Sequence, residues 1–321
     1  MQTLLDTCNT YLSYCEKNKN LADYTLKAYG LDLAQFAAYF GEEHIFEEIC
    51  KHRLRQFHQF LNDKEYAPAT IKRKLNCIQS MFRWLERDDA IAINPFNSIK
   101  IEIKSPKKLP KNIPSDLITH IIKTAKLSLG LKMTEQYAIQ KIAELITSKR
   151  SLNKLTTLLA IELMLCSGMR VGELVKLNLY DINIQQQKIK VMGKGSRERF
   201  VFIPDEELAT LLQAYKQQRY IVQPSHQGFL VNSRGEPAST QFIRKLIKQI
   251  THQAGIELKI TPHMFRHSAA CELLESDVDI RFVQRLLGHH SISTTELYTH
   301  VQDNTLKEKI TKANVRRKLM S

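Results

Sequence analysis

Residues 152–174 read LNKLTTLLAIELMLCSGMRVGEL, and this stretch constrains the fold more than any other. Residues 152–166 are so strongly apolar that they predict a helix buried on all sides. Gly168 is a typical stop for that helix. Arg170 then starts the next helix, with Glu173 three residues on and on the same face. A planar guanidinium at such a corner can point at a phosphate, although an ordinary surface Arg–Glu pair has the same pattern.

Helical periodicity dominates on both sides of this stretch. Residues 1–99 read as all helix. Residues 188–192 and 198–203 are strand-like runs joined by Gly-Lys-Gly-Ser-Arg, which indicates a β-hairpin, and residues 229–231 could add a third strand. Further helices are predicted at 113–125, 134–146, 205–220, 240–254, 262–275, 279–287 and 294–318. The predicted fold class is mainly α with a small antiparallel β-sheet.

A Pro- and Lys-rich segment divides the chain. Residues 100–115 read KIEIKSPKKLPKNIPS and lack apolar periodicity, as expected of a linker. The length of 321 residues suits two domains of about 150 residues each. We therefore expect a helical domain over 1–99, a basic linker over 100–115 and a second domain over 116–321.

The charge distribution points to a polyanionic partner. The net charge is +14, yet the first 105 residues are charge-balanced, so the whole excess lies in the rest of the chain. Local basic clusters are candidate phosphate contacts, although each could be a solvated face. They are Lys72, Arg73 and Lys74 in a helix near 68–85, the linker residues Lys104, Lys107 and Lys108, and Arg197 at the hairpin tip.

The sequence gives no support for a zinc site, for secretion or for membrane insertion. The six cysteines form no C-x-x-C pair, which argues against zinc ribbons and suits free thiols in a reducing cytoplasm. A zinc site built on His289 and His290 would lack further ligands at useful spacing. The sequence has neither an apolar run of membrane-spanning length nor a signal-peptide pattern, so we expect a cytoplasmic protein without membrane contact.

Two further segments carry reactive groups. His263 and Arg266 share one face in the first turn of a helix that Thr261 and Pro262 open, where the positive helix end favours an anion. Ser293 and Glu296 form a capping box, which places Tyr298 early in another helix. Either segment alone could be structural, because histidines and tyrosines are commonly packed.

Together these residues describe phosphoryl transfer. Arginines and histidines can neutralise a pentacoordinate phosphate, Lys194 can protonate a leaving oxygen, and a tyrosine such as Tyr298 can attack phosphorus. Asp and Glu residues with metal-ligand spacing do not accompany them in the sequence, which disfavours a two-metal nuclease. We expect neither a metal nor another cofactor.

The same segments resemble the tyrosine recombinase (phage integrase) family. The matching motifs are a Gly-hydrophobic pair before an arginine followed by x-x-Glu-Leu, a hairpin lysine, His-x-x-Arg-His, Leu-Gly-His, and a tyrosine followed by Thr-His. They occur in the family's order. The N-terminal Thr-Leu-x-x-Tyr, Ala-Thr-Ile-x-x-x-Leu and Asn-Pro-Phe segments resemble the family's core-binding domain, so the resemblance covers nearly the whole chain.

The resemblance implies a site-specific recombinase shaped as a two-domain, C-shaped DNA clamp, with a SAM-like core-binding domain and an integrase-type catalytic domain. It implies that Tyr298 forms a 3′-phosphotyrosine and that no metal takes part. The implied roles are Arg170 and Arg266 on the non-bridging oxygens, Lys194 as acid to the leaving oxygen, His263 as acid–base partner of Tyr298, His289 on the phosphate, and Glu173 as orienting group.

The implied partners are double-stranded DNA and further copies of the chain. We expect a monomer when free, a homotetramer on paired sites, and nucleoid association, with an accessory DNA-bending protein or a partner recombinase as a candidate partner. The family favours docking of residues 304–321 into a neighbouring copy, although the apolar stripe there could also fold back onto its own domain.

Two rival functions and one departure stand beside this interpretation. A type IB topoisomerase would share the chemistry, and a decayed DNA-binding protein would share the fold without it. Residues 126–151 are longer than the connection in compact relatives, so they leave the subfamily open.

Overall fold

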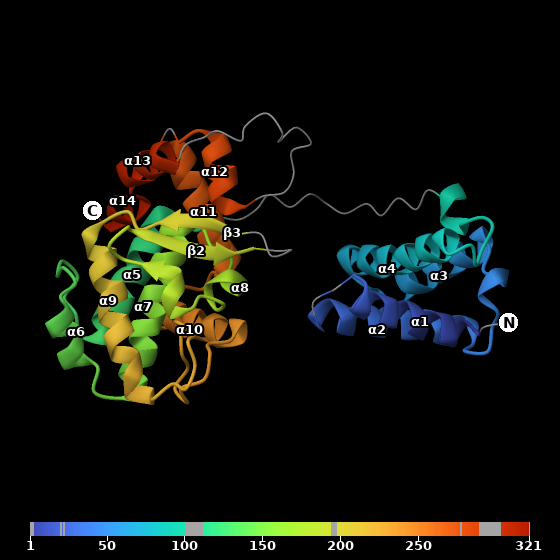
Figure 1. Cartoon of the computed structure of the whole chain (residues 1–321), viewed down its shortest axis with the longest axis horizontal. Coiled ribbons are helices and arrows are strands. Elements are labelled where there is room, and N and C mark those ends of the chain that lie inside the picture. Colours follow the sequence, from blue (N-terminus) through green and yellow to red (C-terminus); the bar gives the residue numbers. More distant parts are fainter. Residues whose placement is uncertain are drawn as a thin grey trace. The chain divides into compact units, whose positions relative to one another are not determined.

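The computed structural model describes residues 3–19, 21, 23–99, 112–193, 198–276, 278–288 and 303–320. The chain divides into two compact units, Met1–Lys108 and Leu109–Ser321, each with its own hydrophobic core (Figure 1). No helix in the described ranges combines the length and the apolar composition that crossing a bilayer requires.

The first unit is a helical bundle. Its aromatic core forms where Phe36 contacts Phe57 and Phe82 edge to face, with ring centroids 5.1 and 6.3 Å apart. Pro68 opens the fourth long helix at its first position, as the sequence predicts. The elements are α1 (Leu4–Lys17), α2 (Asp23–Phe40), η1 (Phe46–Glu48), α3 (Lys51–Asp63), α4 (Pro68–Arg87) and η2 (Pro95–Ser98).

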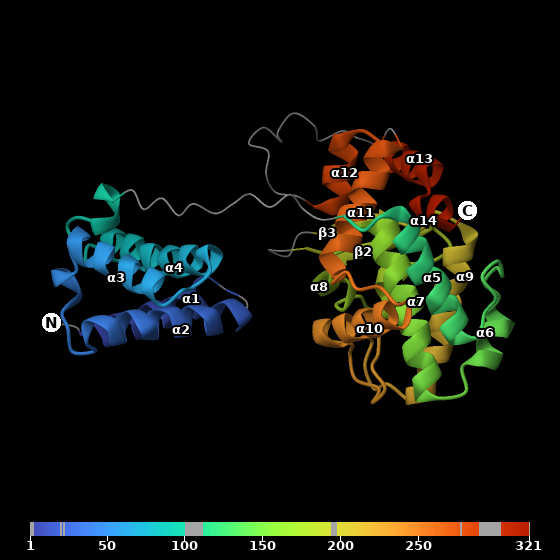
Figure 2. The same ribbon diagram turned by 180° about the vertical axis from the view of Figure 1, so that it is seen from behind.

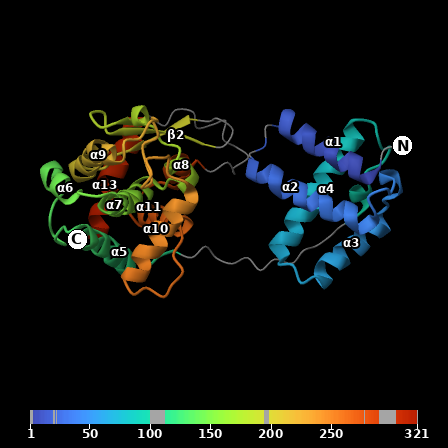
Figure 3. The ribbon, with the colours of Figure 1, turned by 90° about the horizontal axis from the view of Figure 1, so that it is seen from below.

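The second unit is built around one buried helix, α7 (Lys149–Ser167). Every residue from Leu155 to Ser167 is buried, which confirms the prediction made from its apolar sequence. Figure 3 shows α7 and α11 in the centre of this unit with the other helices around them. The surrounding helices are α5 (Ser115–Leu129), α6 (Ile139–Leu145), α8 (Val171–Leu174), α9 (Glu206–Gln218), α10 (Thr240–Gln253), α11 (Pro262–Glu275), α12 (Ile280–Leu287), α13 (Asp303–Ala313) and α14 (Val315–Met320), with 3-10 turns η3 (Leu179–Asp181) and η4 (Arg219–Val222).

A three-stranded antiparallel sheet covers one side of this unit, in the order β1-β2-β3. The predicted hairpin is confirmed as β2 (Lys188–Met192) and β3 (Glu198–Phe202), in a register that pairs Lys190 with Phe200. The prediction of a third strand at 229–231 is wrong. These residues are buried, but they form only one isolated bridge, between Val231 and Pro237, and no ladder. The third strand is β1 (Ile182–Asn183), paired with β2.

The connection over residues 126–151 contains less helix than its periodicity predicts. Gly130 adopts a left-handed conformation (φ 102°) that ends α5, and helix resumes only at Ile139. Tyr137 lies buried between these helices and donates a 2.7 Å hydrogen bond to Glu162 of α7. The apolar side chains of this stretch therefore pack on the unit's own core.

The C-terminal helices also pack on their own unit. Ile310, Val315 and Leu319 are buried in its core, and α14 lies beside α5 (Figure 2). In this structure the described residues 303–320 therefore fold back onto their own unit, which is the alternative to the expected docking of residues 304–321 into a neighbouring copy. The helix predicted over 294–318 is divided at Asn314 into α13 and α14, and its first part lies outside the described residues.

A buried arginine explains why the chain end folds back. Arg316 has 1% of its side chain exposed and pairs with Glu162 of α7 at 2.7 Å and Glu207 of α9 at 2.9 Å. Its guanidinium also lies 5.1 Å from the centre of the Tyr137 ring. Burial raises the pKa of Glu162, against the opposing charge of Arg316, so the carboxylate depends on this cation.

We predict that Arg316→Met lowers the free energy of unfolding by about 3–5 kcal/mol near neutral pH, because Glu162 is left buried without its cation. The loss should shrink as the pH falls and Glu162 takes up a proton in both the folded and unfolded states. Urea denaturation at several pH values measures it. Arg317→Met, at the exposed neighbouring position, should change stability by less than about 0.5 kcal/mol. Equal stabilities of the two variants would contradict the assignment.

Candidate active site

The corner between α7 and α8 places the first candidate residue. Gly168 adopts a left-handed conformation (φ 61°), and its N–H donates to the carbonyl of Met164 to end α7. Arg170 then occupies the N-cap position of α8, as its place in the sequence predicts. A side chain at Gly168 would meet Leu287 of α12, because a Cβ there would lie 2.4 Å from the Leu287 Cδ2 atom. The glycine therefore lets α12 approach the corner closely.

Glu173 collects the basic side chains around it. Its Oε2 accepts the backbone N–H of Arg170 at 2.8 Å and Nη2 of Arg199 at 2.7 Å. Its Oε1 accepts Nη1 of Arg170 at 2.9 Å and Nη1 of Arg199 at 3.1 Å. Burial, the largest influence, raises the pKa of Glu173, but the hydrogen bonds and charges of the two arginines outweigh it. The pKa of Glu173 therefore lies below its ordinary value, and the carboxylate is ionised at neutral pH.

Arg266 of α11 reaches the same place from the other side. Its Nη1 donates to the Gly168 carbonyl at 2.5 Å and its Nη2 to the Leu287 carbonyl at 2.6 Å. Arg170 Nη1 approaches the Leu287 carbonyl too, at 3.4 Å. Burial, followed by the charge of Arg170, lowers the pKa of Arg266 to about 10, so it remains a cation at neutral pH. Two predicted phosphate ligands, far apart in the sequence, thus share one carbonyl oxygen.

The other described candidate, His263, lies at the start of α11, one turn before Arg266. Its side chain is exposed, and no polar partner is found for it among the described residues. Thr261 occupies the predicted N-cap position, but its side chain makes no capping hydrogen bond. His263 is therefore accessible to a partner that the isolated chain does not contain.

Several candidates lie outside the described residues. β2 ends at Met192 and β3 begins at Glu198, so the hairpin tip is not covered. The described chain likewise stops at Gly288, beside the arginines, and resumes at Asp303. The candidates concerned are Lys194, Arg197, His289 and Tyr298, together with the linker lysines Lys104, Lys107 and Lys108.

The sequence interpretation missed Arg199. This residue of β3 donates from Nε to the Leu286 carbonyl at 2.8 Å besides its two bonds to Glu173. Strand alternation could have found it, because Arg199 lies two residues before the fully buried Val201 and so points to the same, inward face. A cation on the inward face of a strand requires a buried anionic partner.

In the first unit, the basic residues of α4 have an internal partner that the sequence did not reveal. Lys74 is buried and pairs with Asp32 of α2 at 2.9 Å, and Arg73 reaches the same carboxylate at 2.8 Å. The expected basic face of α4 is thus partly neutralised, and Lys74 does not present its charge at the surface. Lys72 is exposed.

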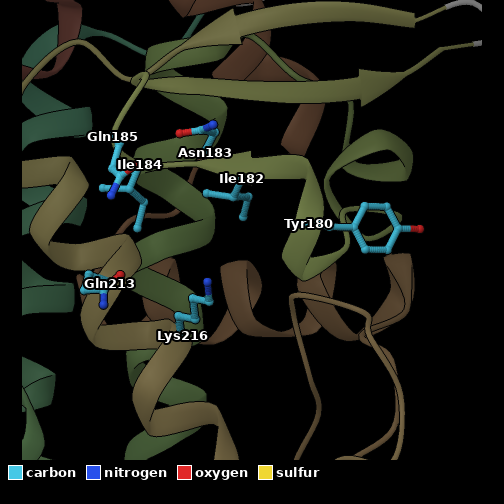
Figure 4. A pocket seen from close by; sticks show the side chains of 7 residues that line it. All are labelled: Tyr180, Ile182, Asn183, Ile184, Gln185, Gln213 and Lys216. Carbon is cyan, nitrogen blue, oxygen red and sulfur yellow. The ribbon is translucent and has the colours of Figure 1, made fainter.

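Two cavities of the second unit are lined by described residues. One of about 290 Å³ lies between β1 and α9, with Tyr180, Asn183, Gln213 and Lys216 around it (Figure 4). Another of about 340 Å³ lies between α7 and α10, beside Arg150 and Asn153. Neither contains a candidate residue. The arginine cluster lies elsewhere, where α8, β3, α11 and α12 meet.

Two arginines converge on one carbonyl oxygen at this corner of the fold, and guanidinium groups so placed are also suited to a phosphate oxygen. Comparison with known proteins gives the family of the chain. The model of the phage integrase family matches residues 132–305, and that of the phage integrase N-terminal SAM-like domain matches residues 8–89. The chain belongs to the phage integrase family. It is a tyrosine-type site-specific recombinase, an enzyme that cleaves and rejoins DNA strands.

Individual relatives agree with this assignment. A tyrosine recombinase of Agathobacter rectalis is 36% identical over 96% of this chain and 96% of its own length. The XerH recombinase bound to difH substrate shares the fold, with a TM-score of 0.64 and 21% identity over 94% of this chain and 84% of that one. A lambda integrase tetramer bound to a Holliday junction has a TM-score of 0.64 and 18% identity over 91% of this chain and 76% of that one. Neither rival, the topoisomerase or the decayed DNA-binding protein, is favoured.

We predict that Gly168→Ala lowers the free energy of unfolding by about 2–4 kcal/mol, because it combines a left-handed alanine with overlap against Leu287. Chemical denaturation measures this. Gly172→Ala is the matched control, because that glycine lies in α8 with no atom within 4 Å of an added Cβ, and it should cost nothing measurable. A Gly168→Ala protein as stable as the control would show that α12 does not need this close approach.

Proposed function

We propose that the arginine cluster is the phosphate-binding half of a recombinase active site completed by Lys194, His289 and Tyr298. The observation that carries the proposal is the convergence of Arg170 and Arg266 on the Leu287 carbonyl, two residues before His289. A backbone carbonyl in this position occupies the donors that a phosphate oxygen would use. Because Arg170 keeps 38% of its side chain exposed, it can turn to an incoming phosphate without unfolding its surroundings.

The proposed reaction conserves phosphodiester bonds. The Tyr298 hydroxyl gives its proton to His263, and its oxygen bonds to the scissile phosphorus. The bond from phosphorus to the 5′-oxygen breaks, and Lys194 protonates that oxygen. The 5′-hydroxyl of another strand then attacks the 3′-phosphotyrosine and releases Tyr298. Arg170, Arg266 and His289 stabilise the charge on the non-bridging oxygens at each step.

Glu173 has an orienting role in this scheme. As an ionised carboxylate it cannot donate to phosphate oxygens, and it lies behind Arg170, bonded to both its backbone and its side chain. It fixes one terminal nitrogen of the guanidinium and leaves the other available. We therefore assign Glu173 to orienting Arg170 and not to acid–base chemistry.

We propose that the partner is double-stranded DNA, bound by a core-binding domain over 1–99 and by a catalytic domain over 116–321. Lys72, Arg73, the linker lysines Lys104, Lys107 and Lys108, and Arg197 would contact its phosphates. Lys74 would act indirectly, by sharing Asp32 with Arg73. The net charge of +14 supports such a partner.

We also propose a monomer when free and a tetramer on paired sites, with an active cytoplasmic form associated with the nucleoid. Lambda integrase forms a tetramer on a Holliday junction, and this chain shares its fold. The described C-terminal helices are committed to their own unit through Arg316, so the contacts between copies would lie elsewhere in the chain.

Tyr298→Phe tests the nucleophile, because it deletes only the phenolic oxygen. We expect the variant to bind DNA with unchanged affinity and to form no covalent adduct. The measurement is a denaturing gel of protein mixed with a pool of nicked duplexes carrying randomised sequence, followed by sequencing of the trapped DNA. Tyr180→Phe, at an exposed tyrosine on η3, is the matched control. Adduct formation by Tyr298→Phe would sink the assignment.

Lys194→Ala tests the general acid, with the site sequence recovered from the trapped DNA. When sulfur replaces the 5′-bridging oxygen of the substrate, the leaving group is a thiolate, which needs no proton. This substrate should therefore restore adduct formation by the variant to near the wild-type rate. On the oxygen substrate we expect a loss on the order of 10²–10⁴-fold, the usual contribution of a general acid. An equal defect on the two substrates would rule out proton donation by Lys194.

A further inference from the structure

Arg199 is placed to act on the site without touching its substrate. All three nitrogens of its guanidinium are engaged inside the protein, Nε with the Leu286 carbonyl and both Nη atoms with Glu173. Only 13% of its side chain is exposed, compared with 38% for Arg170. Because its donors point inward, Arg199 is not available for a phosphate in the way that Arg170 is.

The bonds of Arg199 join three separate elements. Arg199 lies on β3, and its side chain donates to Glu173 of α8 and to the last turn of α12. The last carbonyls of a helix lack intrahelical partners and carry partial negative charge, so a guanidinium there both satisfies and attracts them. Gly288, which ends α12 in a left-handed conformation, brings its backbone against the same guanidinium, since a Cβ there would lie 3.3 Å from Nη1.

The charge balance depends on Arg199 as well. Three guanidinium groups, those of Arg170, Arg199 and Arg266, surround the single carboxylate of Glu173. Arg199 donates one hydrogen bond to each oxygen of the Glu173 carboxylate, while Arg266 approaches Oε2 only to 4.0 Å. Without Arg199, Glu173 would be free to pair with Arg170 through both oxygens or to draw in Arg266. Either change would withdraw positive charge from an incoming phosphate.

We propose that Arg199 is a positioning residue of the recombination reaction. It holds Glu173 and the end of α12 so that Arg170 and Arg266 present their charge to the scissile phosphate. This inference rests on the proposed function of those two arginines, and it adds a residue that acts through them.

The test separates positioning from binding and from folding. Wild type, Arg199→Ala, Arg170→Ala and the control Lys190→Ala are compared on the nicked site for DNA affinity and for the rate of adduct formation at saturating protein. Lys190 lies on the neighbouring strand β2, and its one ion pair among the described residues is a 3.4 Å surface pair with Glu198. We expect Arg199→Ala to bind DNA within threefold of wild type with an unchanged salt dependence. Its saturated rate should fall by on the order of tenfold to a hundredfold, the size expected for a displaced catalytic group. Lys190→Ala should match wild type.

A neutral substrate gives the readout that a merely structural role would not move. Replacing one non-bridging oxygen of the scissile phosphate by a methyl group removes the charge that the arginines neutralise. The defects of Arg199→Ala and Arg170→Ala should both shrink on this methylphosphonate. In a Glu173→Gln background, removing Arg199 should cost little more, because the carboxylate that it restrains is gone.

The possible failures differ from one another. A weaker affinity and a salt slope smaller by about one would show that Arg199 itself binds a phosphate, and the proposal would fall. If the rate of Arg199→Ala falls equally on the phosphate and the methylphosphonate substrates, and in proportion to its loss of thermal stability, Arg199 has a structural role alone. A normal rate for Arg170→Ala would instead overturn the proposed function of Arg170 and the inference with it. If Arg199→Ala does not fold, Arg199→Lys serves, because one ammonium cannot span both Glu173 oxygens and Leu286, and the same outcomes apply.

Discussion

The carboxylate of Glu173 is the constraint on which the active-site architecture depends. A buried anion must be matched by cations, and here Arg170 and Arg199 bind it directly while Arg266 stands 4.0 Å away. The cations outnumber the anion, so the cluster has a net positive charge. Under the proposed function that excess would attract a phosphate, whereas a neutral cluster of the same shape would only stabilise the fold.

A second buried carboxylate, Glu162, has the opposite outcome. Arg316 contacts Glu162, Asp205 and Glu207, so here the acidic groups outnumber the one guanidinium, with Lys126 as the further cation nearby. No positive charge remains for a ligand, and the network fastens the end of the chain to α7 and α9. The two clusters lie in one unit and use the same residue types, and they differ in the ratio of cations to carboxylates. In the first unit, by contrast, two cations, Lys74 and Arg73, share the one carboxylate of Asp32, and Arg73 keeps 44% of its side chain exposed.

The resting geometry has a consequence for how DNA engages. Backbone carbonyls of Gly168 and Leu287 occupy the donors of Arg266, and the Leu287 carbonyl also meets Arg170. A phosphate must compete with these neutral acceptors, which an anionic oxygen does favourably because charge-assisted hydrogen bonds are stronger. Under the proposed function, phosphate binding and the position of the last turn of α12 would therefore be linked through shared donors.

Much of this protein follows from its sequence alone. Apolar runs determined α7 and the helices around it, alternation determined β2 and β3, and the motifs around Arg170 and Arg266 indicated the family and its chemistry, because local periodicity and spacing suffice for these. The sequence could not reveal the partner of Arg199, the neutralisation of Lys74, the third strand at 182–183 or the return of α14 onto its own unit. Each depends on which distant group lies opposite: Glu173 for Arg199, Asp32 for Lys74, Ile189 for Ile182 and Glu162 for Arg316. Local patterns specify which residues are charged or apolar, whereas only tertiary packing decides whether a given charge meets a buried partner or remains free for DNA.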